Sequence, residues 1–459
     1  MHLTVFGTGF VGLVTGSCLA DFGMLVTCVD VDEAKIRALQ QGELPIYEPG
    51  LEEVVKRNVA SKRLIFSADL KKAVKGSLVL FVAVGTESRP DGRANLDHVR
   101  SVAETIGATM EEYKVVVIKS TVPVGTAHQV AEWVRGAQKA AVDFDVVSNP
   151  EFLREGAAVE DFMRPNRVVL GADNPRALAI VKDIYRPLYL IETPFVVTDN
   201  CTAELIKYAN NSFLAIKISF INEVARLCDR TGSDVHVIAR ALGLDGRIGR
   251  KFLHPGPGWG GSCFPKDTRA FVRVFEDYGV ENRMVRASIE VNDEQPGHVL
   301  ATLEKALGTL QGARVALLGL SYKPNTNDVR ESPAIRLANA AIEAGAKVIA
   351  FDPVAIATAK AVLKKPNLEF AANAYAAAKN ADALVLATEW NEFRNLDMAR
   401  VRSEMKGNVI LDARNVYDPV TLTQIGFHYI GVGRPAPAKA QPAPHPVSRP
   451  RARAAKQAR

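Results

Sequence analysis

The sequence predicts an α/β protein with two doubly wound, Rossmann-like domains that are joined by a middle domain of long helices. Three observations support this fold class. Short apolar runs alternate with helical patterns near the N-terminus, a segment without proline or glycine follows at 201–230, and the alternation then returns from Gly312. The 459 residues are also enough for about three domains.

The N-terminal domain is predicted to span residues 1–195. Its apolar runs are separated by helical patterns and have few polar positions, which is typical of parallel strands that are buried on both faces. The expected strands lie in the segments HLTVFG, LVTCVD, SLVLFVAVG, KVVVIKST, DFDVVSNP and RVVLG.

The middle domain is predicted at 196–300. Apolar residues recur at helical spacing from Cys201 to Arg230, so we expect one long helix there. This helix is longer than a crossover between two strands requires, and apolar residues on several of its sides indicate a contact between subunits.

The C-terminal domain is predicted at 301–433. The segments ARVALLGL, AKVIAFDP, ADALVLATEW and NVILDARN indicate strands, and a helix is expected near Ser332–Ala344. A strand that reaches Gly319 is followed by a helix and by a strand that ends at Asp352, as Gly7 precedes Asp30 in the first domain. The later glycines of the N-terminal loop are missing, so we expect a nucleotide-binding domain that holds its ligand differently.

Charge and cysteine content exclude several classes of protein. The whole chain carries +6, and residues 434–459 hold seven Lys or Arg and no acidic residue, so the remainder is close to neutral. Nucleic-acid or membrane binding by the folded body therefore has no support, and the Pro-rich tail is predicted to be disordered. The five cysteines form no C-x-x-C pair, so no metal site is predicted. The sequence shows neither an apolar span long enough for a membrane nor a signal peptide, so we expect a cytoplasmic protein.

The segment Gly7-Thr8-Gly9-Phe10-Val11-Gly12 matches the dinucleotide pattern G-x-G-x-x-G. It lies where a strand becomes a helix, so its amides can approach a pyrophosphate at the positive helix end. Asp30 follows Gly12 by 18 residues and can accept hydrogen bonds from an adenosine ribose. A carboxylate at this position favours NAD over NADP, although the nearby Lys35 is compatible with the extra phosphate of NADP. The alternative to a dinucleotide site is a tight glycine turn beside a solvated aspartate.

The segment from His254 to Asp267, HPGPGWGGSCFPKD, is the densest cluster of unusual residues. It presents Cys263, Lys266 and Asp267 within five positions. A cysteine beside a lysine is predicted to have a lowered pKa and to be nucleophilic. The other cysteines are interpreted as inert side chains of the core, namely Cys18, Cys28, Cys201 and Cys228.

Six motifs in order make the chain resemble the UDP-glucose 6-dehydrogenase family over about residues 1–430. They are GTGFVG, STVPVGT, NPEFLREG, AELIKYANNSFLA, GRIGRKFLHPGPGWGGSCFPKD and GLSYKPNTNDVRESP. The resemblance implies oxidation of the sugar C6 alcohol to a carboxylate by two hydride transfers to NAD. The cysteine adds to the aldehyde, the thiohemiacetal becomes a thioester, and water hydrolyses the thioester.

The same resemblance assigns catalytic roles. Cys263 is the expected nucleophile, and Lys207 and Asn211 stabilise the oxyanion, with Lys207 also able to shuttle a proton. Asp267 and Thr121 hold the catalytic water, and Glu155 is the acid or base of hydrolysis. Without the resemblance, Lys207 and Asn211 are more simply interpreted as a helix surface pair. Thr121 is then a helix cap, and Glu155 is a solvated carboxylate.

Binding residues follow from the resemblance as well. The expected NAD contacts are Gly7, Gly9, Phe10, Val11, Gly12, Asp30, Lys35, Thr86, Thr121, Glu155, Lys266 and Arg330. The expected substrate contacts are Glu151, Phe152, Leu153, Lys207, Asn211, Arg247, Phe252, Pro255, Gly256, Gly258, Gly260, Lys323 and Arg414. Arg247 matches a position that is donated across a subunit interface, so a homodimer or a higher oligomer is expected. Lys323 and Arg414 suit a pyrophosphate, with solvated surface cations as the alternative.

Three other functions stay open at this stage. The residues around Cys263 favour UDP-glucose over UDP-N-acetyl-mannosamine, whereas GDP-mannose dehydrogenases share more of this loop and are the alternative. A non-catalytic nucleotide-sugar-binding paralogue is disfavoured because Cys263, Lys207 and Asp267 are all present. A dehydrogenase of the β-hydroxyacid type needs neither the thiol nor a third domain, so Cys263 and residues 312–430 argue against this class.

Overall fold

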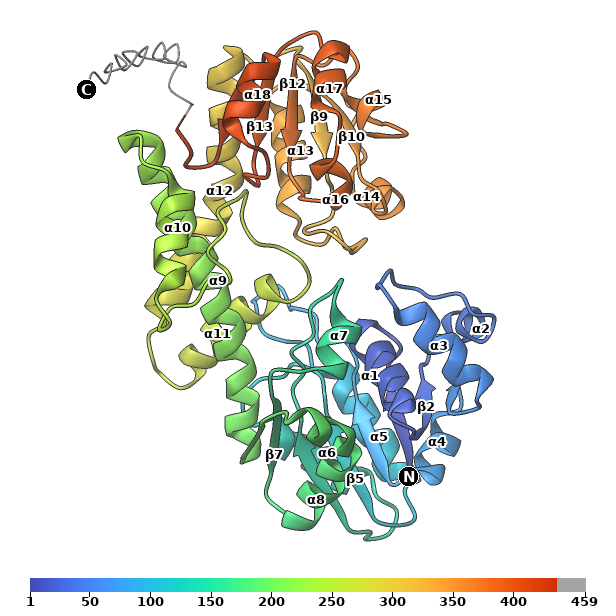
Figure 1. Cartoon of the computed structure of the whole chain (residues 1–459). Helices are drawn as coiled ribbons and strands as arrows, with labels where there is room; N and C mark the ends of the chain where they lie inside the picture. The colour runs from blue at the N-terminus through green and yellow to red at the C-terminus, as the bar shows by residue number, and fades with distance from the viewer. Residues whose placement is uncertain (436–459) are drawn as a thin grey trace, which may run out of the picture.

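The computed structural model describes residues 1–435 as two α/β domains that are connected by long helices (Figure 1). The predicted disordered tail, 434–459, lies outside the described residues except for its first two positions. In the part of the chain that the structure describes, no helix is long and apolar enough to cross a membrane.

The N-terminal sheet has eight strands in the order β3-β2-β1-β4-β5-β6-β7-β8. Their bounds are β1 His2–Phe6, β2 Leu25–Val29, β3 Leu64–Ser67, β4 Val79–Val82, β5 Lys114–Ile118, β6 Phe144–Ser148, β7 Val168–Ala172 and β8 Phe195–Thr198. The expectation of a wholly parallel sheet is wrong at one place, because β6 and β7 pair antiparallel. Only the short helix α7, Ala158–Met163, connects them, so the chain returns without a full crossover.

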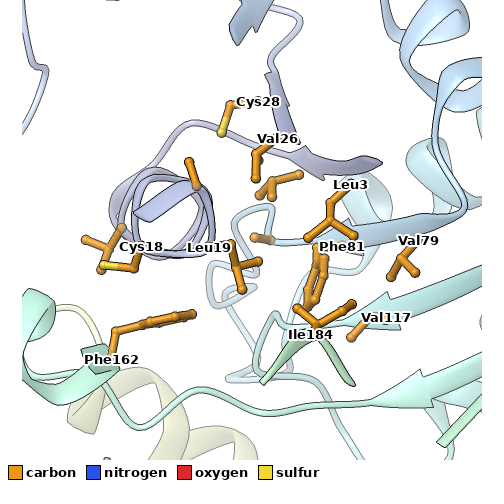
Figure 2. Packing of buried hydrophobic residues seen from close by; sticks show 14 of the residues in the cluster. Leu3, Cys18, Leu19, Val26, Cys28, Val79, Phe81, Val117, Phe162 and Ile184 are labelled. Carbon is orange, nitrogen blue, oxygen red and sulfur yellow. The ribbon is translucent and has the colours of Figure 1, made fainter. Parts of the chain in front are cut away.

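Helices cover both faces of this sheet. They are α1 Phe10–Asp21, α2 Glu33–Gln40, α3 Leu51–Ala60, α4 Leu70–Gly76, α5 Asp97–Thr109, α6 Thr126–Ala137, α8 Pro175–Ile184 and the 3₁₀ helix η1 Arg186–Ile191. Figure 2 shows α1 packed against the strands, with Leu19 and Phe81 in one cluster. Cys18 and Cys28 lie in this core, and burial raises the pKa of each to about 12, as expected for inert thiols.

The middle of the chain is helical, as predicted. Its helices are α9 Asn200–Thr231, α10 Val235–Leu244, α11 Phe264–Asp277 and α12 Arg283–Leu307. The Asp199 carboxylate caps the start of α9, and Gly232 ends it in the left-handed conformation at φ 73°. The helix α9 therefore leaves the edge of the first sheet and runs toward the C-terminal domain (Figure 1).

The C-terminal sheet has six parallel strands in the order β11-β10-β9-β12-β13-β14. The strands are β9 Arg314–Leu318, β10 Lys347–Phe351, β11 Leu368–Phe370, β12 Ala383–Leu386, β13 Val409–Asp412 and β14 His428–Gly431. Its helices are α13 Pro333–Glu343, α14 Ile356–Val362, α15 Ala374–Ala378, α16 Asn391–Arg394, α17 Met398–Glu404 and α18 Pro419–Ile425. In both sheets the strand order reverses at the first strand, which places a binding crevice at the carboxyl ends there. The exact predicted domain boundaries stay predictions.

Candidate active site

The glycines of the first turn bring β1 and α1 close together. Gly7 has φ +95°, and a Cβ there would lie 2.6 Å from the carbonyl oxygen of Ala83. A Cβ on Gly12 would lie 2.0 Å from the carbonyl oxygen of Gly7, whereas Gly9 faces open space. No side chain caps α1 and no acidic residue lies in its first turn. The first-turn amides of this helix therefore suit a pyrophosphate.

Asp30 lies beside this turn at the end of β2. Its Oδ2 accepts hydrogen bonds from the Thr8 amide and hydroxyl, both at 2.8 Å, and from Lys35 Nζ at 3.2 Å. Burial by itself would raise the pKa of Asp30. The hydrogen bonds from Thr8 outweigh this effect and hold the pKa below its ordinary value. Oδ1 receives only the Asp32 amide, at 3.1 Å, so it can still accept a ribose hydroxyl. The residues present thus fit a dinucleotide with free ribose hydroxyls.

Lys207 and Glu151 form a buried ion pair at the centre of the molecule. Lys207 Nζ lies 2.8 Å from Glu151 Oε1, and their side chains are only 4% and 5% exposed. Burial disfavours the charged lysine, but the attraction of Glu151 and Asp267 outweighs it and raises the pKa of Lys207. The surface-pair interpretation of Lys207 is therefore wrong, and Glu151 contacts the lysine directly.

A second cluster surrounds Asp267 on the first turn of α11. Its Oδ2 accepts Asn211 Nδ2 at 2.7 Å, and its Oδ1 accepts Lys266 Nζ at 2.6 Å. Lys266 also reaches Thr86 Oγ1 at 3.5 Å, and Thr86 donates to the carbonyl of Thr121 at 2.8 Å. These bonds connect the carboxyl ends of β4 and β5 to α9 and α11.

Cys263 precedes α11, and the prediction of a lowered pKa is wrong for this thiol. Burial raises the pKa of Cys263 to about 11, and the carboxylates of Glu151 and Asp267 add to the effect, while Lys207 opposes it. Lys266, the neighbour that suggested activation, is paired with Asp267 instead. The thiol therefore needs a proton acceptor before it can attack.

Glu155 lies close to this thiol. Its Oε1 accepts the Ser262 hydroxyl at 3.0 Å and lies 3.8 Å from Arg330 Nη2, and its Oε2 accepts Thr326 Oγ1 at 3.4 Å. Burial and the nearby Asp328 raise the pKa of Glu155. Glu155 is thus a buried carboxyl between the domains, which makes it suited to exchange protons.

Side-chain amides from two long helices hold the glycine-rich loop. Asn292 on α12 accepts from the Trp259 amide at 2.7 Å and donates to the Trp259 carbonyl at 3.0 Å. Asn222 on α9 accepts from the Gly256 amide at 2.9 Å, and Gln295 donates to the Gly256 carbonyl at 3.0 Å. The loop that carries Phe252, Pro255, Gly256, Gly258 and Gly260 is therefore fixed in place.

This loop lies against the C-terminal domain. A Cβ on Gly260 would lie 2.1 Å from the Glu331 carbonyl oxygen, and one on Gly256 would lie 3.2 Å from Arg414 Nη1. Arg414 also donates to the carbonyls of Ala387 and Tyr322 at 2.8 and 3.0 Å. Lys323 has no hydrogen bond or ion pair within residues 1–435, so its ammonium suits an anion.

The structure separates one predicted residue from the others. The Arg247 side chain is 89% exposed and pairs only with Asp245 in the described part of the chain. Phe152 and Leu153, in contrast, lie in the site. The Phe152 ring is 5.4 Å from Lys207 Nζ, and the Leu153 amide donates to Glu151 Oε2 at 2.5 Å.

Sequence reasoning missed several residues that shape the site. Glu204 accepts the amides of Gly125 and Ala127, and Glu48 accepts those of Gly156 and Ala158, which fixes the ends of two site loops. Buried Lys119 donates to Asn149 Oδ1 and to the Tyr185 hydroxyl; Ser262 links Glu155 to Cys263. Glu204 and Ser262 lie inside the family motifs, whereas nothing in the sequence indicated Glu48 or Lys119.

Asp352 occupies the position in the second sheet that Asp30 has in the first. Its Oδ2 accepts the Leu320 and Ser321 amides, the Ser321 hydroxyl and Trp390 Nε1, at 2.8 to 3.2 Å. Its Oδ1 accepts two more amides, and the residue is fully buried. This carboxylate is therefore closed to a ribose, and the C-terminal domain holds its ligand differently.

A dinucleotide-binding sheet that meets a half-buried thiol, a buried lysine and buried carboxylates defines a dinucleotide-dependent oxidoreductase. Comparison with known proteins specifies the class further. The UDP-glucose/GDP-mannose dehydrogenase family matches in three parts, its NAD-binding domain at 1–189, its central domain at 201–294 and its UDP-binding domain at 316–419. The chain belongs to this family.

Relatives with similar sequences cover nearly the whole chain. UDP-glucose 6-dehydrogenase of Rhizobium meliloti is 51% identical over 439 residues, which is 95% of this chain and 100% of the relative. UDP-glucose 6-dehydrogenase TuaD of Bacillus subtilis is 44% identical and covers 95% and 93%. A UDP-glucose dehydrogenase structure from Pyrobaculum islandicum has a TM-score of 0.87 at 40% identity and covers 94% and 98%.

Proposed function

We propose that the protein oxidises UDP-glucose to UDP-glucuronate with NAD, through a covalent intermediate on Cys263. The observation that carries the proposal is the convergence of Cys263, Lys207, Asn211 and Asp267 between an NAD-binding and a UDP-binding domain. The names of the relatives support UDP-glucose as the substrate. GDP-mannose and other NDP-sugars are the alternative substrates.

The first half of the reaction uses the paired lysine. Gly7, Gly9, Gly12 and Asp30 would hold NAD, which would serve as the acceptor of the hydride from C6. Lys207 and Asn211 lie one helical turn apart on α9, so both side chains reach one point and stabilise the oxygen of C6. Asp267 orients Asn211 through their 2.7 Å bond.

The second half uses the thiol. Cys263 adds to the aldehyde, and the resulting thiohemiacetal becomes a thioester by giving up its C6 hydride, for which a second NAD would be the acceptor once the first NADH has left. Glu155 takes a proton from the water that hydrolyses this thioester, and Thr121 and Asp267 hold that water. A reduced Cys263 is required, which suits a cytoplasmic location.

The substrate's diphosphate is assigned to the C-terminal domain. Arg414 lies beside Gly256 and donates to the Tyr322 carbonyl, and the Lys323 ammonium lies over the Tyr322 ring, so both cations border Tyr322 in this domain. Arg330 and Lys266 stand closer to Glu155 and Thr86, and we assign them to NAD.

The count of NADH formed per sugar tests this proposal. Limiting UDP-glucose with excess NAD is expected to give two NADH per sugar, because an alcohol becomes a carboxylate. GDP-mannose is the matched control and is expected to give none. One NADH per sugar would contradict the four-electron route, and NADH from GDP-mannose alone would change the substrate.

We also propose that the chain forms a homodimer through α9. Phe213, Phe220 and Leu227 recur every seven residues along this helix and are 62%, 49% and 63% exposed. In a dimer with twofold symmetry, the apolar stripe of one copy packs against the same stripe of the second copy. Arg247 lies in the adjacent loop, where Lys217 of α9 donates to the Ile248 carbonyl at 3.1 Å, so it can reach the partner's site.

The replacement Phe220→Glu is expected to dissociate this dimer, because it places a charge in the apolar contact. Light scattering of the full chain measures the mass. Val362→Glu is the control, since Val362 is 60% exposed on α14 in the C-terminal domain. A monomeric wild type, or a Phe220→Glu variant that stays dimeric, would contradict the proposed interface.

A further inference from the structure

Ser262 stands between the thiol and the buried carboxyl. Its hydroxyl donates to Glu155 Oε1 at 3.0 Å, and its oxygen lies 3.6 Å from Cys263 Sγ. A hydroxyl has one proton, and here that proton points to Glu155. The contact between Sγ and Oγ must therefore use the proton of the thiol. The hydrogen bonds run in one direction, from Cys263 through Ser262 to Glu155.

No other side chain can take this proton directly. Within residues 1–435, Ser262 is the only side chain that hydrogen-bonds to Cys263 Sγ. The carboxylate of Asp267 is occupied by Asn211 and Lys266, and that of Glu151 by Lys207 and the Leu153 amide. Glu155 receives two hydroxyls and a more distant Arg330, so it has capacity for a proton.

We propose that Ser262 is a catalytic residue that passes the Cys263 thiol proton to Glu155 as the thiol attacks the aldehyde. The Sγ–C6 bond forms while the C6–O double bond becomes an oxyanion beside Lys207 and Asn211. The thiol proton moves to Ser262 Oγ, and the serine proton moves to Glu155 Oε1. No electrons are transferred in this step, and Glu155 gives this proton up to solvent before it takes one from the hydrolytic water. The assignment rests on the proposed function, which supplies the aldehyde.

The charges around the relay suit this transfer. Cys263 faces Glu151, Asp267, Glu155 and Lys207, and burial among these groups raises its pKa. Glu155 faces Asp328, Lys323, Arg330, Tyr322 and Glu48, and its pKa is raised as well. A carboxyl with a raised pKa takes a proton from a thiol at a lower free-energy cost than an ordinary carboxylate does.

Alkylation of Cys263 by iodoacetamide tests the relay without substrate. Ser262→Ala is expected to slow modification of Cys263 about tenfold at neutral pH, because the apparent thiol pKa rises by about one unit. Ser262→Thr keeps the hydroxyl and is the matched control, with a rate close to the wild type. Peptide mapping isolates Cys263 from the other four cysteines, and melting curves confirm that each variant is folded.

A double-mutant comparison separates a relay from two independent effects. If Ser262 acts through Glu155, the Ser262→Ala/Glu155→Gln double variant reacts no more slowly than either single variant. The proposal would be overturned if the double variant were slower than the wild type by the product of the two single losses in alkylation rate. It would also be overturned if the Ser262→Ala variant reacted at the wild-type rate.

Turnover provides the second readout. In single-turnover experiments with UDP-glucose, Ser262→Ala is expected to form the first NADH at the wild-type rate and the second about a hundredfold more slowly. Equal slowing of both would indicate a structural role and overturn the relay. A wild type that forms no NADH from UDP-glucose refutes the proposed function instead, and the alkylation rates still decide the relay.

Discussion

Cys263→Ser is expected to lower the steady-state rate of oxidation by about 10³-fold or more, while the first hydride transfer still takes place. A serine hydroxyl has a much higher pKa than the thiol, so it does not add to the aldehyde at a useful rate. The expected yield in the variant is one NADH per active site in a single turnover. Stopped-flow measurement of NADH and mass spectrometry of the sugar check both parts.

Cys201→Ser is the matched control for this variant. Cys201 is a half-buried free thiol near the start of α9, and its replacement is expected to leave the second hydride transfer unchanged. A Cys263→Ser variant that still forms two NADH per sugar would exclude the covalent route. The Lys207 and Asn211 site would then act on the aldehyde hydrate instead.

Glu151→Gln is expected to lower the free energy of unfolding by about 3 to 5 kcal/mol, because it leaves Lys207 buried without a counter-ion. Lys119 makes the loss larger, since it is a second buried cation near the same carboxylate. Urea unfolding at neutral pH measures the change. Activity is expected to fall as well, because Lys207 then loses either its position or its charge.

Two variants control for this effect. The double variant Glu151→Gln/Lys207→Met removes both charges and is expected to recover most of the stability but no activity. Glu33→Gln breaks an exposed pair with Arg37 on α2 and is expected to cost less than about 0.5 kcal/mol. A Glu151→Gln protein as stable as the wild type would show that the buried pair contributes little.

The main strands and the long helix were predictable because their apolar patterns are strong. β4 and β5 are wholly buried, and α9 has helical spacing over 32 residues. None of the four edge strands was predicted: β3, β8, β11 and β14 each have only three or four residues and are not buried along their whole length. The antiparallel pairing of β6 and β7 depends on how the chain returns after α7, which no local pattern encodes.

The candidate site was predictable where a motif presents its chemistry in a short segment. Cys263, Lys266 and Asp267 lie within five positions, and the glycines before them restrict the loop. The partners of these groups were not predictable from spacing, because Lys207 meets Glu151 across 56 positions and Ser262 meets Glu155 across 107. The direction of the Cys263 pKa shift was wrong for the same reason: tertiary burial outweighs a nearby lysine in the sequence.

Asp352 limits what can be engineered in the C-terminal domain. Restoring the missing glycines after Gly319 would copy the phosphate-binding turn of the first domain, but the acidic partner of the ribose is already saturated by six hydrogen bonds from its own fold. A redesigned second coenzyme pocket must first remove Trp390 and re-route the Ser321 contacts. The two sheets share a topology, yet their ligands are not interchangeable.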